Sequence, residues 1–462
     1  MIQQNGPREQ PNPLRFARRT GTFRRMTRRA ATLEETLDVL ELLPLDFGGA
    51  RESPAADPAF YVEPPTDEAG ADEVPPPPLA EALADRLLGP RHGTTLFLSG
   101  HVGSGKSTQL SKLAADDRIQ KAFSVVPLRV EAEHIPVLDT PLLLLLLSGA
   151  VHDFGHTRGL LSRSARWREI LNDFNARVLG DAGAAGPVGA TSVELGVVFF
   201  KLRQEMKFSE HRRRLLREIG ETQQTLLVDL LRSLTEDVTA ALVQRGESRS
   251  LLLLVDDLDK VRSPEQQREI FDANLAFLLN VPFHVLYTVP TGVVFGPNRA
   301  DVRRSLEHLY PMRVLDKAPR SFDPEKAFIP GSDAFFRAAL DRRVEPRLFD
   351  DAAVRLAAIY SGGVLREFFR LLRTAVRLAR HNRLDVVNAP AVRGAVRDER
   401  RRESMGLLTP DYDALRAIHE THGLASDDGR RYLDEGRVLE CYNDKTWYEV
   451  TPLLWKLLEP RD

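Results

Sequence analysis

The stretch TTLFLSGHVGSGKS, residues 94–107, decides the fold of this chain. Its first half is an apolar run that ends in glycine, which is typical of a buried β-strand. Its second half, GHVGSGKS, matches the pattern G-x-x-x-x-G-K-[ST] in full. A helix-compatible run, STQLSKLAADD, begins at residue 107. A strand, a glycine-rich turn and a helix in this order predict a loop that wraps around a polyphosphate.

The residue types of this loop suit a densely negative ligand. Backbone N–H groups must turn inward, which requires glycine where the backbone bends. The first turn of the helix adds the positive end of its dipole. Lys106 is expected to bring a point charge to the β- and γ-phosphates, and the Ser107 hydroxyl to coordinate Mg²⁺. The residues expected to bind the nucleotide are Gly100, Gly103, Ser104, Gly105, Lys106, Ser107 and Thr108.

A second segment, LLLLVDDLDK at residues 251–260, completes the predicted site. Its aliphatic residues predict a buried strand, and Asp256 follows at the carboxyl end, where it would hold Mg²⁺ through water. Asp257 stands where a carboxylate can polarise the water that attacks the nucleotide, and Asp259 is the alternative acid for that role. Together with the glycine-rich loop, this segment predicts nucleotide hydrolysis.

Apolar runs alternate with segments of helical character along the chain, which predicts an α/β fold with a parallel sheet. Residues 131–247, between the second and third runs, form an unusually long segment that we interpret as a helical insertion. The predicted strands are residues 94–100, 122–130, 250–257, 282–290 and 309–315.

The order of the loop, the acidic strand, the strand VLYTVP and the later SGGVLREFFRLL resembles the AAA+ and STAND branch of P-loop ATPases. The resemblance covers about residues 61–402, and DDLDK also resembles the KAP group. In that branch a further strand lies between the two nucleotide-binding strands, and its polar end contacts the γ-phosphate; Thr288 matches this sensor position. Arg366 matches a second sensor, an arginine that begins a lid helix. The resemblance implies a P-loop NTPase core with an AAA+-like sheet, a helical lid and a C-terminal winged helix.

The resemblance also implies ATP and Mg²⁺ as cofactors and the reaction of ATP with water to give ADP and phosphate. Turnover is expected to be slow, because Asp257 stands where many hydrolysing members have Glu. The expected function is a nucleotide-dependent conformational switch, oligomeric and regulatory, in signalling or defence. The alternative is a DNA-associated remodelling or loading ATPase similar to initiator AAA+ proteins, and a small-molecule P-loop kinase fits less well. Arg303 or Arg304 is the expected arginine that acts on the site of a neighbouring subunit.

Charge and composition narrow the choice of partners. The formal net charge is −2, so nothing attracts nucleic acid or an anionic membrane to the whole molecule. A single cysteine and the absence of a long apolar run favour a cytoplasmic protein without a membrane partner. A second copy of the chain or another protein is the favoured partner, and nucleic acid the less favoured one. Five arginines of the lid form a stripe at helical spacing: Arg366, Arg370, Arg373, Arg377 and Arg380. Arg366 is expected to face the nucleotide, and the other four either contact a partner, another subunit or nucleic acid or form a solvated stripe.

Changes in composition divide the chain into five parts. Residues 1–50 form a basic N-terminal arm, which either grips phosphates or includes residues upstream of a true start at Met26. The remaining parts are a Pro- and acid-rich linker over residues 51–90, an ATPase core over 91–320, a helical lid over 321–402 and a winged-helix-like domain over 403–462.

Overall fold

The computed structural model describes residues 29–46, 53, 56–65, 76–89, 93–162, 166–179, 210–247, 250–296, 299–317, 321–424, 427–443 and 445–460. The predictions for residues 1–28, including the alternative start at Met26, lie outside these ranges. Residues 66–75 of the predicted linker lie outside them as well.

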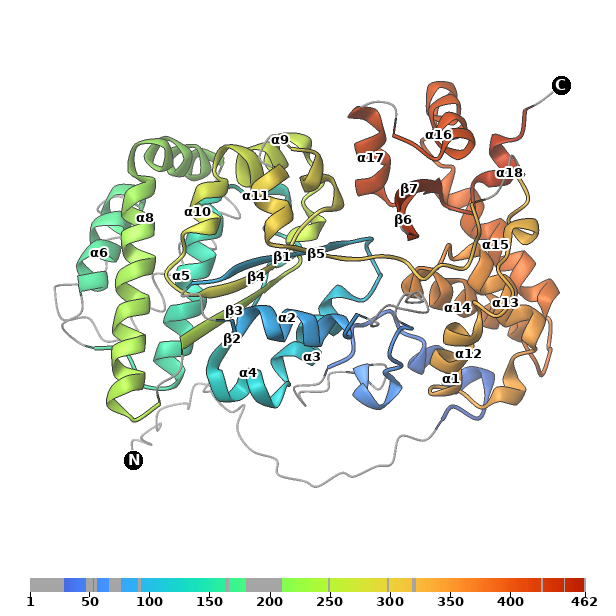
Figure 1. The fold of residues 1–462 in the computed structure, drawn as a ribbon, viewed down its shortest axis with the longest axis horizontal. Coiled ribbons are helices and arrows are strands. Elements are labelled where there is room, and N and C mark those ends of the chain that lie inside the picture. Colours follow the sequence, from blue (N-terminus) through green and yellow to red (C-terminus); the bar gives the residue numbers. More distant parts are fainter. Residues whose placement is uncertain are drawn as a thin grey trace, which may run out of the picture.

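A five-stranded parallel sheet in the order β2-β3-β4-β1-β5 forms the core (Figure 1). β4 lies between β1 and β3, as expected, so the glycine-rich loop and the acidic segment leave the same edge of the sheet. The strands are β1 (Thr95–Gly100), β2 (Phe123–Arg129), β3 (Ser250–Asp256), β4 (His284–Thr288) and β5 (Leu306–Leu309).

The predicted position of the fifth strand is wrong. The strand expected at residues 309–315 is β5, which pairs with β1 from Leu306 to Leu309. Pro311 has no N–H to offer a sheet, and the Met312 N–H donates to the Gly363 carbonyl oxygen in the lid at 3.0 Å. The chain therefore leaves the sheet after Leu309 and crosses to the lid.

Helices cover both faces of the sheet (Figure 1). Alternate residues of β3 point to opposite faces: Leu252 and Leu254 pack with α2 and α3, whereas Leu251 and Leu253 pack with α5 and α8. The helices around the sheet are α2 (Leu79–Leu87), α3 (Lys106–Ala114), α4 (Asp117–Ala122), α5 (Thr140–Thr157), α6 (Arg166–Leu179), α8 (Glu210–Gln244), α9 (Pro264–Gln267), α10 (Leu275–Leu279) and α11 (Arg299–Arg304).

The leucine run at residues 142–147 lies in α5 and is buried within the core cluster that α8 and the sheet share. Among the helices that the structure describes, none combines the length and the apolar character needed to cross a membrane.

The lid consists of α12 (Ala334–Asp341), α13 (Asp351–Tyr360), α14 (Leu365–His381) and α15 (Ala389–Glu403). Its hydrophobic core also includes Leu33 and Val39 of α1 (Leu33–Val39), and Phe60. In Figure 1 the blue helix α1 accordingly lies among the orange lid helices. The predicted arm and linker are therefore not extended where the structure describes them: apolar residues of segments 29–46 and 56–65 pack in the lid, whereas the end of the predicted linker forms α2 on the core.

The last part of the chain is a winged helix that lies beside the lid (Figure 1). Its elements are α16 (Thr409–Thr421), α17 (Asp427–Glu435), β6 (Val438–Asn443), β7 (Lys445–Val450) and α18 (Trp455–Leu458). β6 and β7 pair antiparallel, and Trp455 is fully buried with its Nε1 donating to the Val450 oxygen at 2.7 Å. The molecule thus has the expected architecture: a P-loop NTPase core with an AAA+-like sheet, a helical lid and a C-terminal winged helix.

Candidate functional site

The loop between β1 and α3 has the backbone geometry that its glycines predict. Gly100, Gly103 and Gly105 have φ values of 147°, 93° and 112°, a region that side chains rarely allow. A β-carbon on Gly103 would also lie 2.5 Å from the Cβ of Arg366. Glycine is therefore required at Gly103 both by the turn and by the lid that rests on it.

The Lys106 side chain folds back into this loop. Its Nζ donates to the carbonyl oxygens of Gly100 at 2.7 Å and His101 at 3.0 Å, and it pairs with Asp259 Oδ2 at 2.8 Å. Only 4% of Lys106 is exposed. A buried ammonium group thus sits in the concave side of a turn rich in N–H groups, as binding of a polyphosphate requires.

Asp256, Asp257 and Asp259 bring carboxylate oxygens within 4.8 Å of one another after β3. Asp256 accepts a hydrogen bond from Ser107, so the two residues predicted to hold Mg²⁺ are adjacent. Burial, together with the charges of the neighbouring aspartates, raises the pKa of Asp256 despite that hydrogen bond. Carboxylate and hydroxyl oxygens converging at the end of a phosphate-binding loop fit Mg²⁺, whose charge would relieve this repulsion.

Asp257 forms ion pairs with Arg129 and Lys260, whereas Lys106 pairs with Asp259. Asp257 has a positive φ of 72°, and its Oδ2 lies 2.8 Å from both Arg129 Nε and Lys260 Nζ. Burial would raise the pKa of Asp257, but the hydrogen bonds and charges of Lys260 and Arg129 outweigh it and hold the pKa below its usual range. Asp257 therefore stays ionised and has two cationic partners.

Of the two predicted sensor residues, Arg366 lines the cavity at the loop, whereas Thr288 pairs with Leu98 of β1 and is not among the residues that line that cavity. Thr288 is completely buried at the carboxyl end of β4, and within the described residues its Oγ1 has no hydrogen-bond partner. The Ser104 hydroxyl in the loop is likewise buried without a partner there. Because buried polar groups are normally satisfied, the hydroxyl of Ser104, which lines the cavity, fits a site that gains its partners from a ligand.

Arg366 begins α14 against the loop, with its backbone N–H donating to the Gly103 oxygen at 3.3 Å. No carboxylate of the described residues forms an ion pair with its guanidinium, which lines the same cavity as Lys106, Asp259 and residues 102–109. The lid therefore places a positive charge, without an ion-pair partner in the described residues, beside the phosphate-binding loop.

One wall of the cavity was not predicted from the sequence. Residues 41–45 and 60–62 line it, and the Leu45 N–H donates to the Thr108 hydroxyl at 3.2 Å. The guanidinium of the buried Arg343 lies over the rings of Phe60 and Phe369, at 4.9 and 4.6 Å from their centroids. No motif marks this wall; the only sequence signal is a few apolar residues within a basic and Pro-rich stretch.

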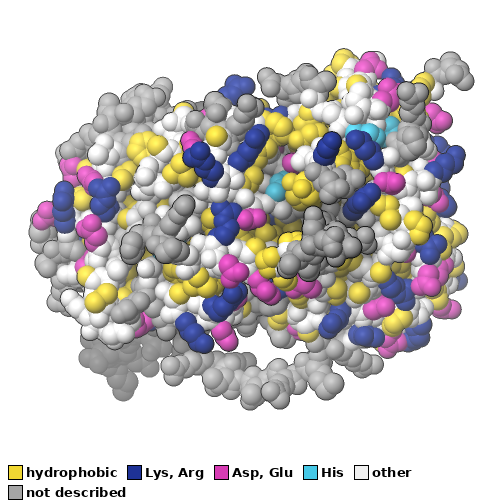
Figure 2. Space-filling view, viewed as in Figure 1, with side chains coloured by type: hydrophobic (Ala, Val, Ile, Leu, Met, Phe, Trp, Pro, Cys, Tyr) yellow, Lys and Arg dark blue, Asp and Glu magenta, His cyan; other side chains and the backbone are white. Residues whose placement is uncertain are grey.

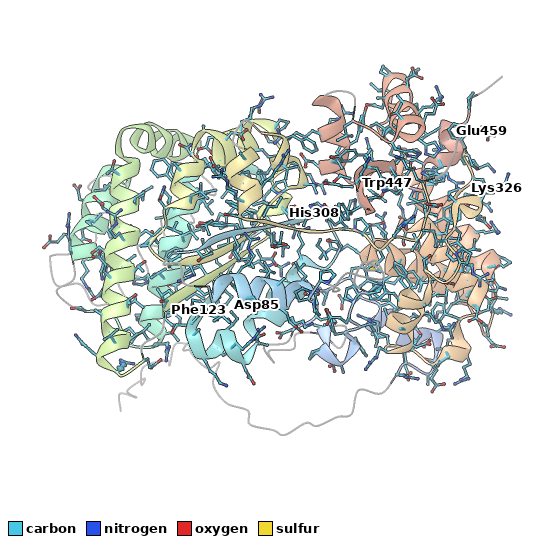
Figure 3. All side chains as sticks on the ribbon, viewed as in Figure 1. Asp85, Phe123, His308, Lys326, Trp447 and Glu459 are labelled. Atoms are coloured by element: carbon cyan, nitrogen blue, oxygen red, sulfur yellow. The ribbon has the colours of Figure 1, made fainter. Side chains whose placement is uncertain are left out.

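The winged helix also contacts the loop. His101, inside the loop, has its Nε2 3.3 Å from the carbonyl oxygen of Gly436. Gly436 precedes the β6–β7 hairpin, which is the wing of the winged helix. His308 bonds through Nδ1 to Ser99 Oγ at 2.6 Å, and its Nε2 lies 4.0 Å from Glu440 Oε2 of β6. Figure 3 shows His308 between the sheet and the winged helix that carries Trp447. Burial lowers the pKa of His101 to about 4 and of His308 to about 3, and raises the pKa of Glu440 to about 7.

A second contact docks α17 on the core. Asp434 accepts from Gln267 Nε2 at 2.9 Å and from the Gly292 N–H at 3.3 Å, and Arg430 donates to Gln267 Oε1 at 2.8 Å. One face of the helix that precedes the wing is therefore turned toward the core.

The predicted arginine stripe of the lid is only partly free. Arg370 pairs with Glu367, Glu399 and Glu403, and Arg380 pairs with Glu34, whereas Arg377 is exposed. Figure 2 shows Lys and Arg side chains interspersed with Asp and Glu over the visible face. The stripe is thus not a continuous basic surface. Arg303 and Arg304, the candidates for action on a neighbouring subunit, are exposed on α11.

No protein-family model matches this chain, and no curated protein matches its sequence. Among solved structures it is similar to the ORC2 protein of Aeropyrum pernix in its ADPNP–ADP complexes, at 14% identity over 84% of this chain and 94% of that one, with a TM-score of 0.39. The A. pernix ORC1 protein in complex with DNA is 17% identical over 82% and 89% of the two chains, with a TM-score of 0.33. A Walker-type ATPase of Pyrococcus abyssi is 13% identical over 87% and 100%, with a TM-score of 0.36. Similarities this weak do not assign a function.

Proposed function

We propose that this chain binds ATP with Mg²⁺, hydrolyses it slowly, and uses the nucleotide state to move its lid and winged helix. The observation that carries the proposal is that the phosphate-binding loop contacts both parts of the molecule that we propose to move. Gly103 contacts Arg366 of the lid, and His101 contacts Gly436 of the winged helix. A ligand in the loop would change both contacts, and ligands of this kind drive such transitions in other switch proteins.

Each site residue has a role in this proposal. Lys106 holds the β- and γ-phosphates, with the N–H groups of the loop around them. Ser107 and Asp256 hold Mg²⁺, which would neutralise charge on the phosphates. Thr288 and Arg366 contact the γ-phosphate, so its loss on hydrolysis removes a tie between the core and the lid. Turnover is slow because the acids after β3 are aspartates, which reach less far than glutamate.

We place the chain nearer to the STAND and KAP switch proteins than to motor ATPases, because DDLDK follows β3 and because the winged helix is docked on the core in this state. We also propose that it assembles with further copies in the cytoplasm, where Arg303 or Arg304 of one copy would reach the γ-phosphate side of the next. Regulation of a signalling or defence partner follows from such a switch.

A DNA-associated remodelling ATPase is the second candidate. A groove between α17 and the core contains Arg262 and Arg268, which are exposed. Within the described residues neither forms a close ion pair, although Arg268 attracts Asp272 and Arg262 attracts Asp434 electrostatically. Such arginines can neutralise DNA phosphates. Against this reading, Asp272, Glu403 and Glu435 line the same groove.

The test is ATP binding and phosphate release by the full chain, compared with Lys106→Ala. We expect Lys106→Ala to abolish ATP binding, because it removes the buried ammonium group from the loop. Lys121→Ala, an exposed lysine on α4, is the matched control and should bind ATP like the parent. ATP binding by Lys106→Ala at parental affinity would refute the site.

The same assay separates the two candidates. A switch should hydrolyse ATP at a rate that depends on protein concentration and is indifferent to DNA. A rate that rises steeply with added DNA and collapses in salt would favour the remodelling ATPase instead.

A further inference from the structure

Each of the three carboxylates after β3 has a different partner. Asp256 accepts a hydrogen bond from the Ser107 hydroxyl. Asp257 forms ion pairs with two cations, and Asp259 forms an ion pair with Lys106. The three aspartates are close together in sequence, yet the turn that starts at the positive φ of Asp257 sends their side chains to different groups. The sequence favoured Asp257 as the acid that serves the attacking water; these contacts point elsewhere.

Asp259 is the carboxylate in direct contact with Lys106. Its Oδ2 lies 2.8 Å from Lys106 Nζ, and both side chains are at least nine-tenths buried. A lysine in this loop reaches the β- and γ-phosphates of a bound nucleotide. A carboxylate within hydrogen-bond distance of that ammonium group consequently lies beside the place of the γ-phosphate.

Asp257 is poorly placed for the same task. Both cations approach the same oxygen, Oδ2, at 2.8 Å, so the negative charge of the ionised carboxylate is already offset. A water could approach only the other oxygen, Oδ1, and a carboxylate that already holds two cations is a weaker acceptor for its proton. The contacts of Asp257 instead suit an anchor that ties the end of β2, through Arg129, to the turn after β3.

We propose that Asp259, and not Asp257, accepts the hydrogen bond from the water that attacks the γ-phosphate; this assignment rests on the proposed ATPase function. The water oxygen forms a bond to the γ-phosphorus while the bond from that phosphorus to the β–γ bridging oxygen breaks. The electron pair of the broken bond leaves with ADP. The proton of the water passes to Asp259 and from there to solvent, so ATP and water give ADP, phosphate and a proton.

Asp259 is also expected to affect ATP binding, the step before hydrolysis. It holds Lys106 in the empty loop, so incoming phosphates compete with it for the ammonium group. Removing the charge of Asp259 should therefore leave ATP affinity unchanged or increase it, while hydrolysis is lost. A residue with a purely structural role would weaken binding and hydrolysis together.

The experiment compares Asp259→Asn, Asp257→Asn and Asp85→Asn in the full chain. Asp85 lies on α2 and pairs with Arg118 at 2.8 Å, which makes it an ion-paired aspartate that does not line the cavity at the loop (Figure 3). ATP affinity is measured with Mg²⁺ and in EDTA, and phosphate release in a single turnover. We expect Asp259→Asn to bind ATP in EDTA at least as tightly as the parent and to release phosphate about 100-fold more slowly. Asp257→Asn should lose less turnover than Asp259→Asn, and Asp85→Asn should match the parent.

A further variant, Asp259→Glu, is the control that separates loss of the carboxylate from a folding defect. It keeps a carboxylate and should recover part of the turnover that Asp259→Asn loses. Turnover by Asp259→Asn equal to that of Asp85→Asn, or a greater loss in Asp257→Asn, overturns the assignment while leaving the ATPase proposal intact. A parent chain that neither binds nor hydrolyses ATP overturns the proposed function itself.

Discussion

Gly363 joins the lid to the chain segment that leaves the core, at a place where no side chain fits. Its φ is 85°, and a β-carbon there would overlap the carbonyl oxygen of Met312. Its own carbonyl accepts the Met312 N–H at 3.0 Å, so the two backbones cannot separate without losing this bond.

We expect Gly363→Ala to lower the free energy of unfolding by about 3 kcal/mol or more, since the backbone strain and the overlap add together. Gly331→Ala is the matched control: Gly331 has φ of 88° but nothing within 4 Å of the added carbon. It should lose only about 1–2 kcal/mol, the strain alone. Denaturant unfolding of both variants measures the difference, and equal losses would mean that the overlap relaxes.

Residue identities at the site were predictable only where chemistry fixes them. Gly103 and Lys106 follow from the motif, because a phosphate loop needs an inward backbone and a cation. The partners of Asp257 and Asp259 were not predictable. They depend on a left-handed turn at Asp257 and on the position of Arg129, which β2 contributes from elsewhere in the chain.

At the scale of elements, α14 shows how a regular pattern can mislead. The spacing of its arginines correctly indicates one helix face, but α15 supplies acids to that face. Glu399 is completely buried, and Arg370 lies 2.9 Å from Glu403 and 3.7 Å from Glu399. The face is therefore partly an interface between two lid helices.

We expect Arg370→Ala to destabilise the protein by about 2 kcal/mol or more, because it leaves buried carboxylates without this cation. Arg377→Ala removes an exposed arginine from the same helix and should change stability by less than about 0.5 kcal/mol. Thermal or denaturant unfolding of the two variants provides the comparison. A similar, small effect of both would show that solvent already screens the Arg370 cluster.

Continuous apolar runs predicted four strands at their true positions. β5 was misplaced because it is half-exposed along its length, so LEHL lacks the pattern of a buried strand. The packing of α1 was missed for a related reason. Its apolar positions are few, and the basic residues before it dominate the composition of the segment.

At the scale of the whole molecule, the boundary between the core and the winged helix contains ionisable groups that burial keeps neutral. Glu440 of β6 faces His308 of β5, and His101 reaches the Gly436 carbonyl nearby. Such a boundary should respond to pH. Sequence patterns predicted the winged helix itself, but not where it docks, since docking depends on contacts such as Gln267 with Asp434 between distant parts of the chain.

Burial raises the pKa of Glu440 from 4.5 to about 7. Since the folded protein holds this proton more tightly, the stability that the neutral Glu440 contributes is complete below pH 4.5 and is lost as pH rises through 7. We expect Glu440→Gln to match the parent in melting temperature near pH 5 and to exceed it at pH 8. His101 and His308 stay neutral across this range and are common to both proteins, so they cancel in the comparison. An equal difference at both pH values would contradict the prediction.

The contribution of α1 and Phe60 to the core of the lid also bears on how the chain folds during synthesis. Leu33, Val39 and Phe60 leave the ribosome early, but the helix α14 that covers them is made some three hundred residues later. Until then these apolar side chains lack their native cover, and exposed apolar surface promotes aggregation. A fragment that stops after the sheet would carry the same exposed surface permanently, so we expect it to aggregate more readily than the full chain.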